Sequence, residues 1–273
     1  MECVYINLDG QAERRAFLES NFAAHNSAGW PLARISAVGS EEVRQLGLPG
    51  RLRDPEKGAL LSHRKALTQV LPGAGHALIL EDDVLFGPDS CERIQSAAGT
   101  LDDAAWDMIF TDVSVVEPDA MARLFSLRRQ LMRAKKEMLL PLRDIPFCGS
   151  SAYLVHQRFK PRLQELLLRQ ASLDWPIDLH LRRLIHEGEI RAFVTFPFVT
   201  SLSRFADQSQ SQLQDGAVTD TVWNAFRRFI WLHRDIDAAL APLEALGADF
   251  ADPEARAFAG LMAAALSENM VFK

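Results

Sequence analysis

Short apolar runs of strand length alternate with amphipathic helical segments along most of this chain. The pattern predicts strands at residues 4–8, 33–38, 77–80, 108–110, 149–155 and 190–198, and helices at 12–24, 54–71 and 159–170. Strands that alternate with helices favour a mostly parallel sheet covered by helices on both faces. We therefore predict an α/β fold with a Rossmann-type, mostly parallel sheet flanked by helices.

A change in composition near residue 215 divides the chain. Polar residues at 207–215 predict a loop, and the Ala-rich segment from Thr221 onward has a helical pattern. We therefore predict a main α/β domain over residues 1–215 and a C-terminal helical extension, packed on it, over 216–273. Asp54 followed by proline is typical of a helix start, so we expect Asp54 to be an N-cap.

Composition and charge exclude several classes of protein. With 48% hydrophobic and 24% charged residues, the chain is typical of globular proteins. A formal net charge of -6 argues against non-specific nucleic-acid binding, which needs a basic surface. The sequence contains neither a signal-peptide pattern nor an apolar run of about 18 residues. We therefore expect a soluble cytoplasmic protein, and we expect its three widely spaced cysteines to be free thiols.

The strongest local signal is the sequence LILEDD at residues 78–83, where an apolar strand runs directly into three acids. Ligands of open parallel sheets bind at the carboxyl ends of the strands. Three adjacent carboxylates repel one another, and a hard cation such as Mg²⁺ or Mn²⁺ would offset that repulsion. A solvated turn would also explain such a triplet, so on its own this signal is weak.

Other polar residues lie near predicted strand or helix ends. His63 shares a helical face with apolar residues, which predicts that it points inward, where a core role is the usual one and a functional role is the alternative. Asp178 is predicted to lie in a turn, close to His180. Asp112 follows another predicted strand and is the alternative carboxylate for acid–base chemistry. Tyr153 fits ordinary strand packing.

Taken in order, several motifs resemble those of glycosyltransferase family 25. The most specific are EKGALLSH at residues 56–63 and LILEDD at 78–83, preceded by YINLD at 5–9 with two arginines at 14–15. Later blocks that fit the family are Gly149 with AYL at 152–154, PID at 176–178, and PFV at 197–199 followed by Ser209. The resemblance covers about residues 2–211, and Ala59 replaces a cysteine that is common in the family.

The resemblance implies a GT-A-like fold, a UDP-sugar donor, dependence on a divalent metal, Mn²⁺ or Mg²⁺, and inversion at the anomeric carbon. The family includes bacterial lipooligosaccharide galactosyltransferases and the collagen galactosyltransferases. It therefore implies transfer of a sugar, galactose in the first instance, from the UDP-sugar to a surface-glycan acceptor such as lipopolysaccharide core. The partners expected are a nucleotide sugar and a glycan or lipid-linked glycan acceptor.

Site roles follow from the same resemblance. Asp83 is expected to bind the metal, with Glu81 contacting the metal or the nucleotide sugar. Asp178 is the expected general base, with Asp112 as its rival. The remaining residues expected at the donor site are Asn7, Arg14, Ser62, His63 and Asp82.

Two other functions stay open at this level. A metal-dependent nucleotide hydrolase could also use acids at a strand end, and a catalytically inactive relative could bind nucleotide or glycan without turnover. Nucleotide release that depends on an added acceptor separates a transferase from a hydrolase. Intact UDP binding without turnover would indicate an inactive relative.

A basic segment at residues 123–136 matches no family block. Its cations are Arg123, Arg128, Arg129, Arg133, Lys135 and Lys136, and it contains no acid. Leucines at helical spacing predict an amphipathic basic helix that extends to about residue 140. A helix face that is simply solvated would explain the charges equally well. The alternative is contact with an anionic acceptor or with the anionic inner face of a membrane, which would make the protein peripheral there.

Overall fold

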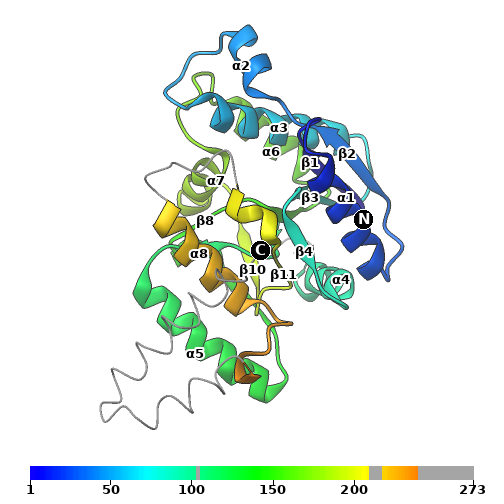
Figure 1. Cartoon of the computed structure of the whole chain (residues 1–273), viewed down its shortest axis with the longest axis vertical. Coiled ribbons are helices and arrows are strands. Elements are labelled where there is room, and N and C mark those ends of the chain that lie inside the picture. The colour runs from blue at the N-terminus through cyan, green and yellow to red at the C-terminus, as the bar shows by residue number, and fades with distance from the viewer. Residues whose placement is uncertain (103–104, 209–216, 239–273) are drawn as a thin grey trace.

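The computed structural model describes residues 1–102, 105–208 and 217–238 and contains a seven-stranded central sheet (Figure 1). In spatial order the strands are β2 (Leu32–Ser36), β1 (Glu2–Asn7), β3 (Ala77–Glu81), β9 (Ala152–Val155), β5 (Met108–Phe110), β10 (Ala192–Phe196) and β7 (Met138–Pro141). Neighbouring pairs β2–β1, β1–β3 and β5–β10 are parallel, whereas β9 and β7 run antiparallel to their neighbours. The predicted α/β class with a mostly parallel sheet is confirmed.

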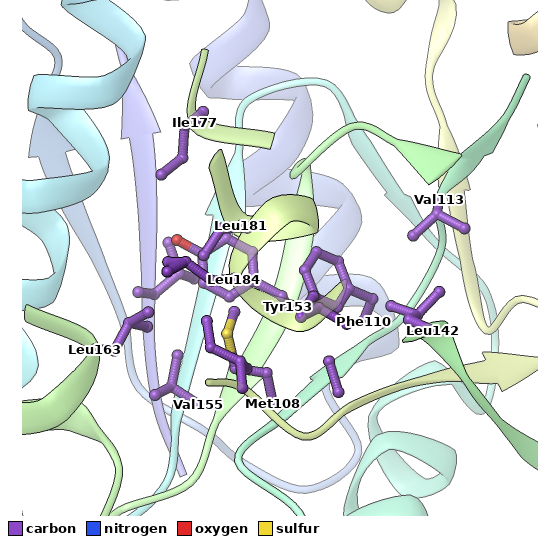
Figure 2. Close-up of a cluster of buried hydrophobic side chains, with 14 of the residues drawn as sticks. Met108, Phe110, Val113, Leu142, Tyr153, Val155, Leu163, Ile177, Leu181 and Leu184 are labelled. Atoms are coloured by element: carbon purple, nitrogen blue, oxygen red, sulfur yellow. The ribbon is translucent and has the colours of Figure 1, made fainter. Parts of the chain in front are cut away.

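Helices cover both faces of this sheet. One buried cluster joins the sheet to α3 (Asp54–Val70), α6 (Lys160–Leu168) and α7 (Ile177–His186), and Figure 2 shows part of it. A second cluster on the other face includes α1 (Ala12–His25) and α4 (Ser90–Thr100). Because strand side chains alternate between faces, Ile79 joins the first cluster and Leu78 and Leu80 join the second.

The remaining elements are short or lie at the periphery. They are α2 (Ser40–Leu46), α5 (Pro118–Ala134), α8 (Ala217–Ile230), the 3-10 turns at Leu142–Asp144 and Arg204–Gln208, and two small ribbons, β4 (Val84–Phe86) with β11 (Thr200–Leu202) and β6 (Ser114–Val115) with β8 (Phe147–Cys148). Helix α8 belongs to the predicted C-terminal extension, and residues 239–273 of that extension lie outside the described residues. Among the described residues, no helix has both the length and the apolar character needed to cross a bilayer.

Some predicted boundaries were wrong for local reasons. The basic helix stops at Ala134, because Lys135 adopts a left-handed conformation (φ 52°), and residues 138–141 form β7 instead of continuing the helix. The predicted strand at 149–155 begins only at Ala152, since Gly149 also has a positive φ. The N-cap of α3 is Arg53, one residue before Asp54, and its backbone N–H is bound by Glu56.

Arg128 does not belong to the exposed basic face predicted for residues 123–136. Its side chain is buried and donates hydrogen bonds to the carbonyls of Trp231 and Arg234, which follow α8. The other cations of the segment are exposed, and we call them the basic surface: Arg123, Arg129, Arg133, Lys135 and Lys136. The correction follows from the helical period, which turns Arg128 toward α8 and Arg129 and Arg133 toward solvent.

Candidate functional site

A cleft of about 260 Å³ opens at the carboxyl edge of β1, β2 and β3, between α1 and α3. Its polar lining brings together residues from three separate motifs: Asn7, Arg14, Ser62, His63, Glu81 and Asp82. Ile6, Leu8, Val38 and Phe205 add apolar surface. Every residue that the sequence suggested for the donor site therefore lines this one cleft.

The alternation of strand side chains distributes the first two acids. Ile79 faces α3, so Glu81, two residues further along, lies on the α3 side, where His63 is found. Asp82 lies on the α1 side and meets Arg14. Although Glu81 and Asp82 are adjacent acids in the sequence, their carboxylates therefore contact residues of two different helices, α3 and α1.

Asp82 is held by the N-terminal motif. Arg14 approaches one carboxylate oxygen with Nε at 2.7 Å and Nη2 at 2.6 Å, and Asn7 donates to the other oxygen at 2.7 Å. Arg14 also donates to the carbonyl of Phe205, which ties α1 to the segment after β11. Asp82 is therefore already neutralised and oriented by protein groups.

Asp83 is less well compensated. It is buried, its Oδ2 lies 3.2 Å from Arg14, and its Oδ1 has no hydrogen-bond partner among the described residues. Burial and the neighbouring charge of Glu81 raise the pKa of Asp83 to about 7, although Arg14 acts in the opposite direction. A buried carboxylate oxygen without a partner is costly, and a cation would remove that cost.

Glu81 is held by neutral donors and remains partly open to the cleft, with 37% of its side chain exposed. Ser150 donates to Oε1 at 3.1 Å, and Nε2 of His63 lies 3.3 Å from the same oxygen. Burial acts to raise the pKa of Glu81, but the hydrogen bonds from His63 and Ser150 and the positive charge of Arg227 together hold it below the ordinary value. Glu81 is thus kept ionised beside the cleft.

Ser62 lines the cleft, but protein groups use its hydroxyl. It donates to the carbonyl of Gly58 at 2.6 Å and accepts the backbone N–H of Val38 at 2.8 Å. A Cβ added at Gly58 would lie 2.4 Å from the carbonyl oxygen of Val38. Ser62 and Gly58 therefore fix α3 against the end of β2, and a direct bond from Ser62 to a ligand would have to replace these contacts.

The two candidates for the general base lie in different surroundings. Asp112 is fully buried and forms an ion pair with Arg227 of α8, with Arg227 Nη2 at 2.7 Å. Arg227 is itself buried and also contacts Ser151. An acid locked in this way has no access to an acceptor hydroxyl, so the geometry disfavours Asp112 as the base.

Asp178 lies in the first turn of α7, so the predicted turn was wrong and the residue is helical. Its Oδ2 accepts the backbone N–H of Gly149 at 2.9 Å. Gly149 begins the segment whose next residue, Ser150, bonds to Glu81. Asp178 does not line the donor cleft itself; instead it borders the segment that contacts Glu81.

Two acids of the cleft edge, Glu81 and Asp83, could contribute to a divalent-metal site. The described part of the chain contains no cluster of three or more His, Cys, Asp or Glu side chains arranged to hold an ion. Glu81 and Asp83 still offer two carboxylates, one open to the cleft and one with an unpartnered oxygen. This donor set fits Mg²⁺ or Mn²⁺, which proteins often bind through one or two carboxylates completed by water and substrate phosphates.

Three residues that contact predicted site residues were not themselves predicted to belong to the site. Tyr153 was assigned to strand packing, yet its hydroxyl contacts His63 at 2.8 Å. Ser150 and Arg227 belong to none of the sequence motifs, since Ser150 lies just before a strand and Arg227 lies far along the chain from the acids. Only the alternation of β9, which puts Tyr153 on the same face as Ile79, could have suggested the first of them.

The scan against known protein families finds no match for this chain, and no curated protein matches it. Its assignment therefore depends on the motifs and on the geometry of the cleft.

Proposed function

We propose that this chain is an inverting glycosyltransferase of GT-A-like fold that moves a sugar, galactose by family resemblance, from a UDP-sugar to a surface-glycan acceptor such as lipopolysaccharide core. The observation that carries the proposal is the convergence of three motifs on one cleft. Asn7 with Arg14, His63, and Glu81 with Asp82 come from segments far apart in sequence and line the same cleft at the carboxyl edge.

Each residue has a role suited to a sugar nucleotide. Arg14 is the cation at the cleft and can share its guanidinium between Asp82 and a diphosphate oxygen, as arginine does with phosphates. Leu8, Val38 and Phe205 supply apolar surface for the uracil ring of the nucleotide. Asn7 keeps Asp82 oriented while Arg14 engages the ligand.

Glu81 and Asp83 would hold the divalent ion, with the diphosphate supplying further oxygens. When bound, a divalent ion stabilises the negative charge that develops on the departing UDP. The protein groups prepare for this chemistry: His63 and Ser150 keep Glu81 ionised, and the burial of Asp83 disfavours its charge until a cation compensates it. The ion would therefore be bound together with UDP more tightly than alone.

Asp178 is the proposed base. It would take the proton from the acceptor hydroxyl as that oxygen attacks the anomeric carbon from the face opposite UDP, which gives inversion. Its bond to Gly149 links it to the segment that contacts Glu81, so acceptor and donor sites would meet at residues 149–151.

The basic surface defined above is proposed as the contact for an anionic partner. Its five cations form no ion pair with another described residue, and Met132 and Met138 are exposed beside them. Cations interspersed with apolar side chains suit the surface of an anionic membrane, where lipid-linked acceptors reside. The protein would then act in the cytoplasm, peripherally at the inner membrane face.

The deciding experiment is a panel of nucleotide sugars incubated with Mn²⁺, with and without lipid-A-core acceptors. Acceptor-dependent release of UDP together with a glycosylated product supports the proposal. Release of nucleotide that ignores the acceptor would indicate a hydrolase. UDP binding in calorimetry without any turnover would indicate a catalytically inactive relative.

A further inference from the structure

Glu81 receives both of its side-chain hydrogen bonds on the same oxygen. His63 and Ser150 contact Oε1, whereas Oε2 has no hydrogen-bond partner among the described residues. Glu81 lines the cleft, and about a third of its side chain is exposed there (37%). One oxygen is therefore fixed by the protein while the other is available to a ligand.

His63 is itself held from behind. Its Nδ1 lies 2.8 Å from the hydroxyl of Tyr153, and the two rings stack with centroids 5.7 Å apart. The register of β3 and β9 explains the arrangement, because Tyr153 pairs with Ile79 and both face α3. Glu81 follows two residues later on the same side, so one helix residue contacts both strands.

From this geometry we propose that Tyr153 is a positioning residue that fixes His63 as the Nε2–H tautomer, so that His63 holds Glu81 Oε1 and leaves Oε2 for the ligand. An ionised Glu81 can only accept a hydrogen bond, so Nε2 must carry the proton. In the neutral ring Nδ1 is then an acceptor, and the Tyr153 hydroxyl is its donor. The chain of bonds runs from Tyr153 to His63 to Glu81.

Packing alone does not account for a tyrosine at this position. Tyr153 lies in the apolar cluster beside Phe110 (Figure 2), with ring centroids 5.6 Å apart, and Phe110 fills its place without a hydroxyl. Tyr153 is 1% exposed, and a buried hydroxyl is retained at no cost only when it has a partner. His63 is the partner that the structure provides.

The tautomer can be measured without reference to any activity. Nitrogen-15 NMR of the histidine rings distinguishes Nε2–H, Nδ1–H and doubly protonated forms, and His63→Gln assigns the His63 signals by their loss. We expect the Nε2–H form in the unmodified chain and a mixture of tautomers in Tyr153→Phe. Tyr5→Phe is the matched control: it also removes a buried strand hydroxyl, one that bonds Glu19, and it should leave His63 unchanged.

Three NMR results would overturn the inference: an imidazolium at neutral pH in the unmodified chain, an Nδ1–H ring there, or an unchanged tautomer in a folded Tyr153→Phe variant. Thermal melting of both tyrosine variants establishes that they are folded. A change in tautomer seen equally in Tyr5→Phe would also count against a specific role for Tyr153.

The consequence for ligand binding rests on the proposed function. Tyr153→Phe should weaken Mn²⁺-dependent UDP binding by about 10- to 100-fold, as expected when a group behind a ligand-binding side chain is lost. His63→Gln keeps an N–H that can reach Glu81, so it should retain more affinity than His63→Ala. Equal UDP affinities for these two variants would overturn the role of the N–H that residue 63 donates to Glu81.

The two proposals fail separately. If the unmodified chain binds no UDP with Mn²⁺ but the tautomer responds to Tyr153→Phe, the positioning of Glu81 stands and the glycosyltransferase proposal loses its support. If UDP binds normally and the tautomer is insensitive to Tyr153, the positioning role is wrong and the function is untouched.

Discussion

Two of the arginine–carboxylate pairs at the carboxyl edge of the sheet lie in different halves of it and differ in burial. Arg14 and Asp82 border the cleft, and their side chains are 13% and 12% exposed. Arg227 and Asp112 lie on the other side of the acidic run, and their side chains are 4% and 0% exposed. The same kind of ion pair therefore borders a cleft in one half of the sheet edge, whereas in the other half it is sealed, that is, buried away from solvent.

The difference in burial separates two uses of one ion pair. A pair beside the cleft can exchange partners when an anionic ligand arrives, because water and ligand can replace the lost bonds. A sealed pair cannot exchange, and removal of one partner leaves an uncompensated buried charge. We therefore expect the Arg14 half to bind ligand and the Arg227 half to hold α8 on the sheet, with Asp178 as the chemically active group of that second half.

The largest expected effect tests whether Asp178, in the half of the sheet edge that contains the sealed Arg227–Asp112 pair, is the general base. Asp178→Asn should lower the rate of transfer by about 10²–10⁴-fold, because the amide cannot take the acceptor proton. UDP affinity should barely change, since the amide oxygen can still accept the bond from Gly149. Single-turnover kinetics together with UDP calorimetry measure both quantities.

Asp112→Asn is the comparison for that experiment. If it abolishes transfer in a stable protein while Asp178→Asn stays active, then Asp112 is the base. A loss of donor binding in Asp178→Asn would instead make Asp178 a ligand of the donor site.

The next effect concerns the sealed pair as a structural clamp. Arg227→Met should lower the free energy of unfolding by about 3–5 kcal/mol, because it leaves the buried carboxylate of Asp112 without a counter-ion. Arg227→Met combined with Asp112→Asn should recover most of that loss, since both charges are then gone. Arg14→Met should cost less stability, because Asp82 reaches water through the cleft. Urea denaturation measures all three, and an Arg227→Met loss no larger than that of Arg14→Met would remove the distinction between the halves.

Asp83 lies between the halves and gives a pH test. Its folded-state pKa of about 7 exceeds the ordinary 3.8, so between these values the folded protein binds more protons than the unfolded one. The contribution of Asp83 to stability therefore falls as pH rises through this window. Asp83→Asn should gain about 2–4 kcal/mol relative to the unmodified chain between pH 4 and pH 8 without metal.

The same variant tests the metal. Asp83→Asn should lose Mn²⁺-dependent UDP binding while the unmodified chain keeps it, and Mn²⁺ with UDP should reverse the stability order at pH 8. Calorimetry and melting curves with and without Mn²⁺ provide the measurement. Equal metal-dependent affinity in both proteins would remove Asp83 from the metal site.

The smallest expected effect lies away from both pairs, on the basic surface. Replacing Arg129 and Arg133 with Gln should weaken binding to vesicles rich in anionic lipid by about 2 kcal/mol at low salt, and the deficit should shrink as salt rises. The control replaces Arg44, which lies in α2, and Arg51, both of which are exposed; α2 lies far from α5 in Figure 1. Co-sedimentation that is equal for both double variants would leave the segment as a solvated helix face.

The sequence alone supplied the class of fold and most of the cleft. Apolar runs bounded by turn residues identified the parallel strands of the sheet, and the rule that ligands bind at their carboxyl ends placed Asn7 and the acids of 81–83 at one edge. Such signals are readable because strand alternation and helical period are local properties. They could not reveal that β9 enters the middle of the sheet antiparallel, since pairing partners are chosen by packing over long sequence distances.

The tertiary structure decided the partners of each charged group. Asp82 and Asp112 are both acids at strand ends in sequence, yet one borders a cleft and the other is sealed, because α8 brings Arg227 to Asp112 from 115 residues away. Arg128 likewise belongs to a basic run but points at α8, and Tyr153 acquires a partner only when α3 packs over β9. Local patterns fix which residues share a face, whereas burial and the choice of counter-ion depend on segments that meet only in the folded chain.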